Sequence, residues 1–356
     1  MLPVADLQLQ PCRFSLTALQ FHSLYNQTPF SIKKTIADMT KESLRIVYMG
    51  TPDFAVESLR ALVEGGYNVV AVITMPDKPI GRHGNQLQPS PVKTYALEHG
   101  LKIMQPANLK DPEFVEELRS LHADLQIVVA FRMLPQVVWQ MPPLGTFNAH
   151  ASLLPKYRGA APINWAVING EKETGVTTFF LKHEIDTGDI IQQVKIGISD
   201  TDNVEVVHDK LMVLSGKLVT ETVDNIIAGT VTSIPQDEIR DVEPTPAPKI
   251  FRDTCRIDWN QPSKKVHDFV RGLSPYPAAW TTLNGKSVKI TEASPITDGK
   301  AAAEPGTIDT DHKTYLHAAT ADGWLDIRTL QIEGKKRMAT ADLLRGLKID
   351  DDACFE

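Results

Sequence analysis

The chain has 356 residues, of which 42% are hydrophobic and 23% charged, and its formal net charge at pH 7 is −7. This length predicts two domains, and the composition is typical of a soluble globular protein. No apolar run is long enough to span a bilayer, which argues against a membrane partner. Cys12, Cys255 and Cys354 are odd in number and far apart, a pattern that fits neither a disulfide framework nor a zinc site. We therefore expect a cytoplasmic protein without a bound metal.

Charge is distributed unevenly along the chain. Residues 43–245 carry 17 Lys and Arg against 25 Asp and Glu, whereas residues 246–349 carry 16 against 12. A basic C-terminal part predicts a polyanionic partner for that part. Ordinary variation in surface charge is the alternative, and charge alone does not decide between the two.

The first 42 residues show neither a helical nor a strand period. They lack a cationic start, a long apolar stretch and a small-residue cleavage site, so a secretory signal is not indicated. Met39, followed by Thr40-Lys41-Glu42, would make a natural start. We expect residues 1–42 to be a disordered extension.

Folded structure is predicted to begin with a β-α-β unit. An apolar strand at 44–49 precedes a stretch of helical period at 54–63, which Thr51 or Asp53 is suited to cap. A second buried strand follows at 67–74, so the two strands should be parallel. The turn after the first strand has one glycine where a dinucleotide fingerprint needs three, which argues against an NAD site.

Residues 75–93 form a long proline-rich segment that contains the cations Lys78, Arg82 and Lys93. Loops of this length inside compact domains are usually functional or disordered. We predict a loop that contacts a substrate, with a floppy surface insertion as the alternative.

The alternation of helices and strands then continues. Its predicted elements are a helix at 91–99, a strand at 101–104, a helix at 111–122, a strand at 123–131 and a strand ending at 150. This order predicts an α/β fold with a Rossmann-like, open, mostly parallel sheet. Because ligands bind beyond the carboxyl ends of such strands, Phe131 and His150 are expected to be neighbours.

Further elements complete a predicted catalytic domain over residues 43–233. They are a helix at 163–168, a strand at 176–182, a loop at 183–189, a strand at 190–198 that we expect to be antiparallel to its predecessor, and an amphipathic helix capped by Asp202.

A polar, proline-rich stretch at 234–248 is predicted to be a linker. The short strand-like runs beyond it predict an OB-like β-barrel over residues 249–349. The expected strands are 255–259, 280–283, 287–291, 315–318 and 324–330, with one helix at 264–271. Asn284-Gly285 is a favourable hairpin turn between two of them.

A polar cluster is predicted where the strand ending at His150 meets the next loop. Asn148 and His150 lie two positions apart, on one face of a strand, and Asp186 lies in a later loop. An amide beside a histidine can hold a developing oxyanion, and a carboxylate on the second ring nitrogen would prepare the histidine for proton transfer. No nucleophile elbow is present, which favours direct transfer through a tetrahedral intermediate. The alternative is a structural histidine and an aspartate that caps a turn.

The sequence resembles the folate-dependent formyltransferases. The run from Asn148 to Ile163, NAHASLLPKYRGAAPI, and the downstream IDTGD at 185–189 are similar to the signature of that family. The start at 44–54, the loop at 76–93 and three C-terminal motifs are similar to the members that act on methionyl-tRNA. These motifs are RIDW at 256–259, PYP at 275–277 with Trp280, and GKKRM at 334–338. The resemblance covers residues 43–346.

The resemblance implies transfer of the formyl group of 10-formyltetrahydrofolate to the α-amino group of charged initiator methionyl-tRNA, for translation initiation. It implies no metal and no obligatory protein partner. Asn148 and His150 would polarise the formyl oxygen, and Asp186 would orient His150 and relay the proton. The folate site would be lined by Ser152, Leu153, Leu154, Pro155, Arg132 and Leu134. The tRNA would be bound by Lys78, Arg82, Lys93, Lys335, Lys336 and Arg337.

The chain departs from the family pattern in two places. After Arg82 it has His83-Gly84-Asn85-Gln86 where relatives often have further glycine and lysines, and Lys182-His183-Glu184 stands where many have Asp-x-Gly. Two other functions are weighed against the leading one. Formylation of a small amine, such as a sugar nucleotide, is disfavoured by the second domain, and an RNA-binding module on an inactive scaffold is disfavoured by the intact polar cluster.

Overall fold

A computed structural model describes residues 39–80, 86–240, 242–297, 303–350 and 352–356. The predicted extension over residues 1–38 and the loop cation Arg82 lie outside the described residues. The chain forms two compact units. Unit 1 comprises the chain up to Arg158, Gly175–Ile196 and Asp209–Thr245, and unit 2 comprises Gly159–Thr174, Gly197–His208 and Pro246–Glu356. Because the two units alternate along the sequence, the domain boundaries expected from the sequence stay predictions.

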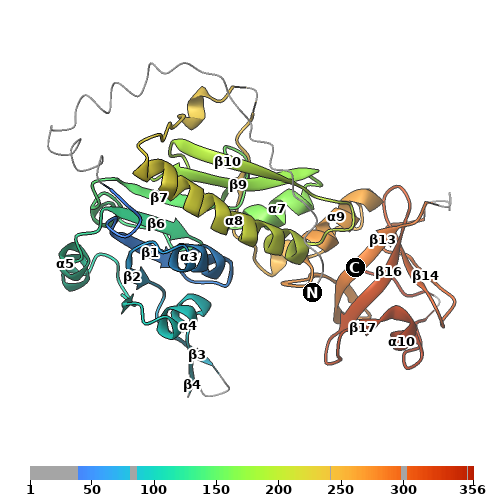
Figure 1. Cartoon of the computed structure of the whole chain (residues 1–356). Helices are drawn as coiled ribbons and strands as arrows, with labels where there is room; N and C mark the ends of the chain where they lie inside the picture. The colour runs from blue at the N-terminus through green and yellow to red at the C-terminus, as the bar shows by residue number, and fades with distance from the viewer. Residues whose placement is uncertain (1–38, 81–85, 241, 298–302, 351) are drawn as a thin grey trace. The chain divides into compact units, whose positions relative to one another are not determined.

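Most of a seven-stranded sheet lies in unit 1 (Figure 1). In sheet order its strands are β10 (Ile190–Gly197), β9 (Glu173–Phe180), β7 (Thr146–His150), β6 (Leu125–Val129), β1 (Ile46–Gly50), β2 (Val69–Ile73) and β5 (Ile103–Met104). The five strands from β7 to β5 are parallel, and β9 is antiparallel to β7. Phe180 N–H donates to the Asp189 carbonyl and Ile198 N–H to that of Lys172, so β10 is antiparallel to β9. The predicted open, mostly parallel sheet is confirmed.

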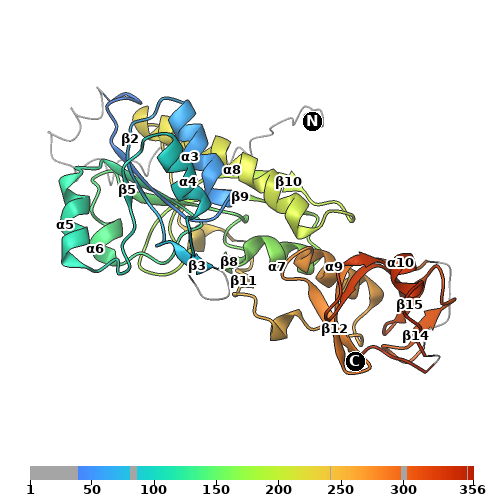
Figure 2. The same cartoon turned by 90° about the horizontal axis from the view of Figure 1, so that it is seen from below.

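Helices cover both faces of this sheet (Figure 2). They are α3 (Phe54–Glu64), α4 (Pro91–Glu98), α5 (Pro112–Ser120), α6 (Gln136–Trp139) and α8 (Val204–Ile227). Since successive strand residues face opposite sides, Val47 and Met49 of β1 pack in one apolar cluster with α5 and α6. The hydroxyl of Tyr48, between them, donates to a carbonyl of α3 at 2.5 Å. Ser58 of α3 and Ser215 of α8 share a buried hydrogen bond, so these two helices lie side by side. No helix among the described residues is long and apolar enough to cross a membrane.

The N-cap of α8 differs from the prediction. Asn203 Oδ1 accepts from Val206 N–H at 2.9 Å, whereas the Asp202 carboxylate accepts from Ser199 N–H at 3.0 Å. The prediction that Asp202 caps this helix is therefore wrong. Asparagine is as good a cap as aspartate, and the preceding turn uses the Asp202 side chain. At α3 the cap is Asp53, one of the two residues predicted.

The proline-rich segment at 75–93 is more regular than expected. β3 (Lys78–Ile80) and β4 (Gln86–Gln88) pair antiparallel, so its described residues form the base of a hairpin. Ser90 then caps α4 by accepting from Lys93 N–H.

Unit 2 contains a six-stranded sheet that is separate from the first. Its elements are β12 (Ala279–Leu283), β13 (Lys286–Pro295), β14 (Ile308–Thr310), β15 (Leu316–Ala319), β16 (Trp324–Ile332), β17 (Met338–Ala339) and α10 (Thr340–Leu344). Neighbouring strands of this sheet pair antiparallel. β12 and β13 are joined at Asn284-Gly285, where both residues have positive φ, as the predicted hairpin requires. The sheet is consistent with the expected OB-like barrel.

The C-terminal residues close this barrel. The open sheet runs from β12 at one edge to β14 at the other. Phe355 bridges to Leu283 at the β12 edge, and Cys354 bridges to Thr307 at the β14 edge. The buried Phe355 ring also stacks on Trp259 at 5.4 Å. The strand predicted at 255–259 is wrong, because this stretch begins as a single turn of 3-10 helix, η2 (Asp253–Cys255), and continues as an isolated bridge.

Two helices complete unit 2. α7 (Pro162–Ile168) and α9 (Ser263–Leu273) pack together, and Asn164 Nδ2 donates to the Gly272 carbonyl at 2.9 Å. A Cβ on Gly272 would come within 2.5 Å of Ile168, so this glycine permits the close approach. The predicted linker at 234–248 contains ordered elements, namely a 3-10 turn, η1 (Gln236–Glu238), and β11 (Pro246–Ala247), which pairs with β8 (Arg158–Gly159).

Candidate active site

His150 is the last residue of β7 and is 7% exposed. Its Nε2 lies 2.8 Å from the carbonyl oxygen of Tyr157, in the loop that follows the strand. A carbonyl oxygen can only accept a hydrogen bond, so Nε2 carries a proton. In the neutral imidazole Nδ1 is then the nitrogen with a lone pair. The loop backbone thus selects the tautomer of His150.

Asp186 faces the other ring nitrogen. Its Oδ2 lies 3.8 Å from His150 Nδ1, beyond hydrogen-bond distance, and its side chain is 12% exposed. Asp186 has a φ of 53°, a left-handed conformation that aspartate tolerates better than most residues. The structure therefore brings the predicted pair together, but with the carboxylate close to the ring rather than hydrogen bonded to it.

The turn that carries Asp186 is stabilised by hydrogen bonds from the segment predicted to be a linker. Gln236, which is 4% exposed, donates through Nε2 to the carbonyl oxygens of Asp186 and Gly188, both at 2.8 Å. Its Oε1 accepts from Arg158 Nε at 3.1 Å and from Nη2 at 2.7 Å. One buried amide thus joins the turn that carries Asp186 to the loop that follows His150.

Asn148 lies two residues before His150 on the same strand face. Its side-chain oxygen is buried and has no hydrogen-bond partner among the described residues. An unsatisfied buried polar atom costs about 1–3 kcal/mol, and rotation of the amide would present an N–H at the same point. Such an atom at a strand end fits a place where a polar substrate group binds.

The turn at 152–155, predicted to line the folate site, is largely buried. Ser152, Leu154 and Pro155 are buried, and only Leu153 is partly exposed. Side chains on the neighbouring strands β9 and β10 stabilise this turn by hydrogen bonds. Thr177 Oγ1 donates to the Ser152 carbonyl at 2.6 Å, and Gln193 Nε2 donates to that of Leu154 at 2.8 Å. Direct contact with a ligand is therefore open to Leu153, while the other three shape the loop.

The two other predicted folate residues follow β6. Arg132 donates through Nη1 to the Ala107 carbonyl at 2.9 Å and through Nη2 to that of Pro106. Its Nε is buried without a partner among the described residues, and burial lowers the pKa of its guanidinium. Leu134 is buried in the apolar cluster that also contains Val138. Arg132 thus retains a donor for a ligand, whereas Leu134 packs in the core.

The predicted tRNA-binding residues that the structure describes differ in their exposure and in their ion pairs. Lys93 is half-buried and pairs with Asp77 at 2.6 Å, so it anchors the β3–β4 hairpin. Lys78 is exposed on β3. In unit 2, Lys335, Lys336 and Arg337 are exposed in the turn between β16 and β17, and none of them forms an ion pair with another described residue. These three are the better placed to bind phosphate.

Sequence reasoning missed the residues that act through hydrogen bonds. Gln236, Tyr157 and Thr177 are ordinary residues in their local sequence, and a single sequence gives no sign that they meet Asp186, His150 and Ser152. Within the described ranges, no three His, Cys, Asp or Glu side chains gather in a way that could hold a metal ion. The chemistry available at this site is that of an amide, an imidazole and a carboxylate. It suits the attack of an amine on an acyl carbon.

Comparison with protein families supports this chemistry. The model described as "Formyl transferase" matches residues 44–223, and that described as "Formyl transferase, C-terminal domain" matches residues 249–348. The chain is 65% identical over 319 residues to a methionyl-tRNA formyltransferase from Bacteroides fragilis, with 88% of this chain and 98% of that protein covered. It is 66% identical over 321 residues to the enzyme of that name from Parabacteroides distasonis, with 87% and 98% covered.

Solved structures of the same fold are more distant in sequence. The sugar 3N-formyl transferase WlaRD, solved with dTDP and 5-N-formyl-THF, superposes with a TM-score of 0.60 at 19% identity, over 82% of this chain and 99% of that one. HypX from Aquifex aeolicus, in complex with tetrahydrofolic acid, gives a TM-score of 0.58 at 21% identity, over 86% and 48%. At these identities the likeness concerns the fold.

Proposed function

The chain belongs to the formyl transferase family, and on this premise we propose that it transfers the formyl group of 10-formyltetrahydrofolate to the α-amino group of methionyl-tRNA. The identity of 65% to the methionyl-tRNA formyltransferase of Bacteroides fragilis, over almost the full length of that protein, supports this acceptor. The single structural observation that supports the chemistry is the approach of Asp186 to His150, the last residue of the strand that also carries Asn148.

The amide and the imidazole act on the formyl oxygen. When the amine attacks, the formyl carbon becomes tetrahedral and its oxygen gains negative charge. The side-chain amide of Asn148 stabilises that charge by donating an N–H. A preorganised donor of this kind typically contributes a factor of about 100–1,000 to the rate.

His150 and Asp186 accept the proton of the attacking amine and pass it to the folate nitrogen. Since Nε2 is protonated toward Tyr157, Nδ1 and the Asp186 carboxylate are two acceptors 3.8 Å apart. The attacking nitrogen becomes positively charged and loses a proton to this pair. The same proton then protonates the folate nitrogen as its bond to the formyl carbon breaks, which releases tetrahydrofolate and formylated methionyl-tRNA.

Acceptor binding and location complete the proposal. The exposed cations of the β16–β17 turn bind the tRNA backbone, and Lys78 on the β3–β4 hairpin contributes further charge. The reaction takes place in the cytoplasm, where charged initiator tRNA is available, and it requires no protein partner.

The test is a single-turnover assay with labelled 10-formyltetrahydrofolate and methionyl-tRNA, with a sugar nucleotide amine as the competing acceptor. We expect formylated tRNA and no formylated sugar. His150→Ala should slow the transfer by about 100- to 10,000-fold while leaving tRNA binding intact. Near-normal turnover of His150→Ala would refute the mechanism, and preferential labelling of the sugar would refute the acceptor.

A further inference from the structure

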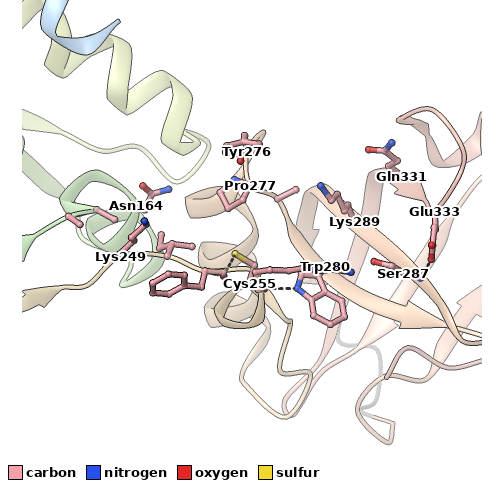
Figure 3. A pocket seen from close by; sticks show the side chains of 16 residues that line it. Asn164, Lys249, Cys255, Tyr276, Pro277, Trp280, Ser287, Lys289, Gln331 and Glu333 are labelled. Atoms are coloured by element: carbon pink, nitrogen blue, oxygen red, sulfur yellow. Dashed lines mark hydrogen bonds between the residues drawn. The ribbon is translucent and has the colours of Figure 1, made fainter. Parts of the chain in front are cut away.

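A cavity of about 740 Å³ lies within unit 2 (Figure 3). Its volume falls in the range of ligand-binding pockets, about 300–1,000 Å³. Its lining residues come from the segments at 160–164, 249–255 and 276–280, from strands of the second sheet, and from Glu333 just after β16. Neither the catalytic residues nor the cations of the β16–β17 turn line it. None of the contacts proposed above therefore involves this cavity.

The floor of the cavity is a row of side chains across three strands. Trp280 on β12 is paired with Lys289 on β13, and Lys289 is paired with Gln331 on β16. Residues paired in this way have adjacent side chains on one face of the sheet. Because Ala279 and Thr281, which flank Trp280, are buried, this row lies on the outer face of the barrel. An aromatic ring and an ammonium group are thus presented side by side.

The walls carry aromatic rings that are unusually exposed. Tyr276 is 81% exposed and Phe251 is 60% exposed, although large apolar side chains are normally buried. Figure 3 shows Tyr276 on the wall beside Pro277, with Trp280 below it. Exposed large rings around a cavity indicate a site that binds something with a flat apolar face.

Cations are placed against these rings. The Lys249 ammonium lies 5.5 Å from the centroid of the Phe251 ring, and the Arg252 guanidinium lies 5.6 Å from that of Trp280. With Lys289, the lining has three positive groups and one carboxylate, Glu333. None of the three forms an ion pair with a described residue. Positive charge interleaved with exposed rings is the pattern of single-stranded nucleic-acid sites, in which bases stack and phosphates pair with cations.

We propose that this cavity binds an unpaired stretch of the tRNA that accepts the formyl group, with bases stacked on Tyr276 and Phe251 and the flanking phosphates on Lys249, Arg252 and Lys289. The inference rests on the proposed function, since it names a contact made by that acceptor. Bases within a duplex have both faces covered by their neighbours, so stacking on protein rings selects unpaired nucleotides. The cavity would add affinity for the acceptor without touching the reacting atoms.

The first test measures binding of a fluorescein-labelled single-stranded RNA, with the same strand annealed to its complement as the competitor. We expect the single strand to bind more tightly. Tyr276→Ala and Phe251→Ala should each weaken binding about tenfold, since stacking on one ring has about that effect. Tyr276→Phe keeps the ring and should bind normally. Lys313→Gln removes an exposed cation outside the cavity and should also leave binding unchanged.

The second test measures formyl transfer to methionyl-tRNA with the same variants. Tyr276→Ala should raise the KM for the tRNA about tenfold and leave kcat unchanged. Because Tyr276 is exposed, its truncation should not alter the unfolding temperature. Unchanged RNA affinity and unchanged KM in both aromatic variants would overturn the inference, even if the chain formylates methionyl-tRNA. Conversely, ring-dependent RNA binding without any formyl transfer would preserve the cavity as a nucleotide site and remove the proposed function instead.

Discussion

The Tyr157 carbonyl determines how His150 can react. Because it accepts from Nε2, the lone pair of the neutral ring is directed to Nδ1, on the side where the Asp186 carboxylate lies. In the proposed reaction the attacking amine donates to this pair of acceptors. The separation of 3.8 Å fits a site whose hydrogen bonds to the substrate form when the amine binds.

Gln236 offers the sharpest test at the residue scale. Gln236→Glu keeps an acceptor for Arg158 but replaces the Nε2 donor with an oxygen that faces the carbonyls of Asp186 and Gly188. We expect the Asp186 turn to shift and single-turnover formyl transfer to slow about 100-fold, because a displacement of roughly 1 Å at a reacting group has that effect. The measurement is the transfer rate at saturating methionyl-tRNA.

A control variant must show that a loss of fold stability does not by itself slow formyl transfer. Ser58→Ala removes a buried hydrogen bond between α3 and α8 that involves no residue of the turn, and should cost about 1–3 kcal/mol of unfolding free energy, similar to the cost of Gln236→Glu. Its transfer rate should stay normal. If the two variants lose activity equally, Gln236 stabilises the fold and does not position Asp186.

At the scale of elements, the end of β9 and the Asp186 turn are packed with no spare room. A Cβ on Gly188 would lie 1.6 Å from the carbonyl oxygen of Phe180, so Gly188→Ala must move the turn or the strand. We expect a loss of several kcal/mol in stability together with a large drop in transfer rate. Gly66→Ala is the matched control. Gly66 has a φ of 76° but nothing within 4 Å of its added Cβ, so its variant should lose about 1 kcal/mol and keep its rate.

Elements were predictable where one local signal determined them. The buried apolar runs of β1, β2 and β6 predicted parallel strands, and Asn284-Gly285 predicted a hairpin, because period and turn chemistry act over a few residues. The Asn148, His150 and Asp186 cluster came from residue chemistry together with a family resemblance.

The features that the sequence did not predict depended on contacts between segments far apart in the sequence. Trp259 packs on Phe355, from the C-terminal residues that close the barrel, and 255–259 did not become a strand. Gln236 lies in a polar, proline-rich stretch whose composition suggested a linker, yet its amide is buried against a distant turn. Such partners are set by tertiary packing, which local pattern does not encode.

At the scale of the whole molecule, an acidic chain has to bind a polyanion. The formal charge is −7, yet residues 246–349 carry 16 Lys and Arg against 12 Asp and Glu. Local charge therefore opposes the net repulsion. If Lys335, Lys336 and Arg337 bind phosphates, each neutralised phosphate releases counterions, and the affinity for tRNA falls as salt is added.

The decisive comparison is between two triple variants that remove equal charge. Changing Lys335, Lys336 and Arg337 to Gln should raise the KM for methionyl-tRNA and reduce the slope of log affinity against log salt by about 0.9 for each phosphate that the variant no longer neutralises. The KM for 10-formyltetrahydrofolate should not change. Changing the exposed Lys265, Lys286 and Lys313 to Gln alters the net charge of unit 2 by the same amount. If both triple variants reduce the slope equally, the tRNA responds to the overall field of the unit, and the β16–β17 turn is not its binding site.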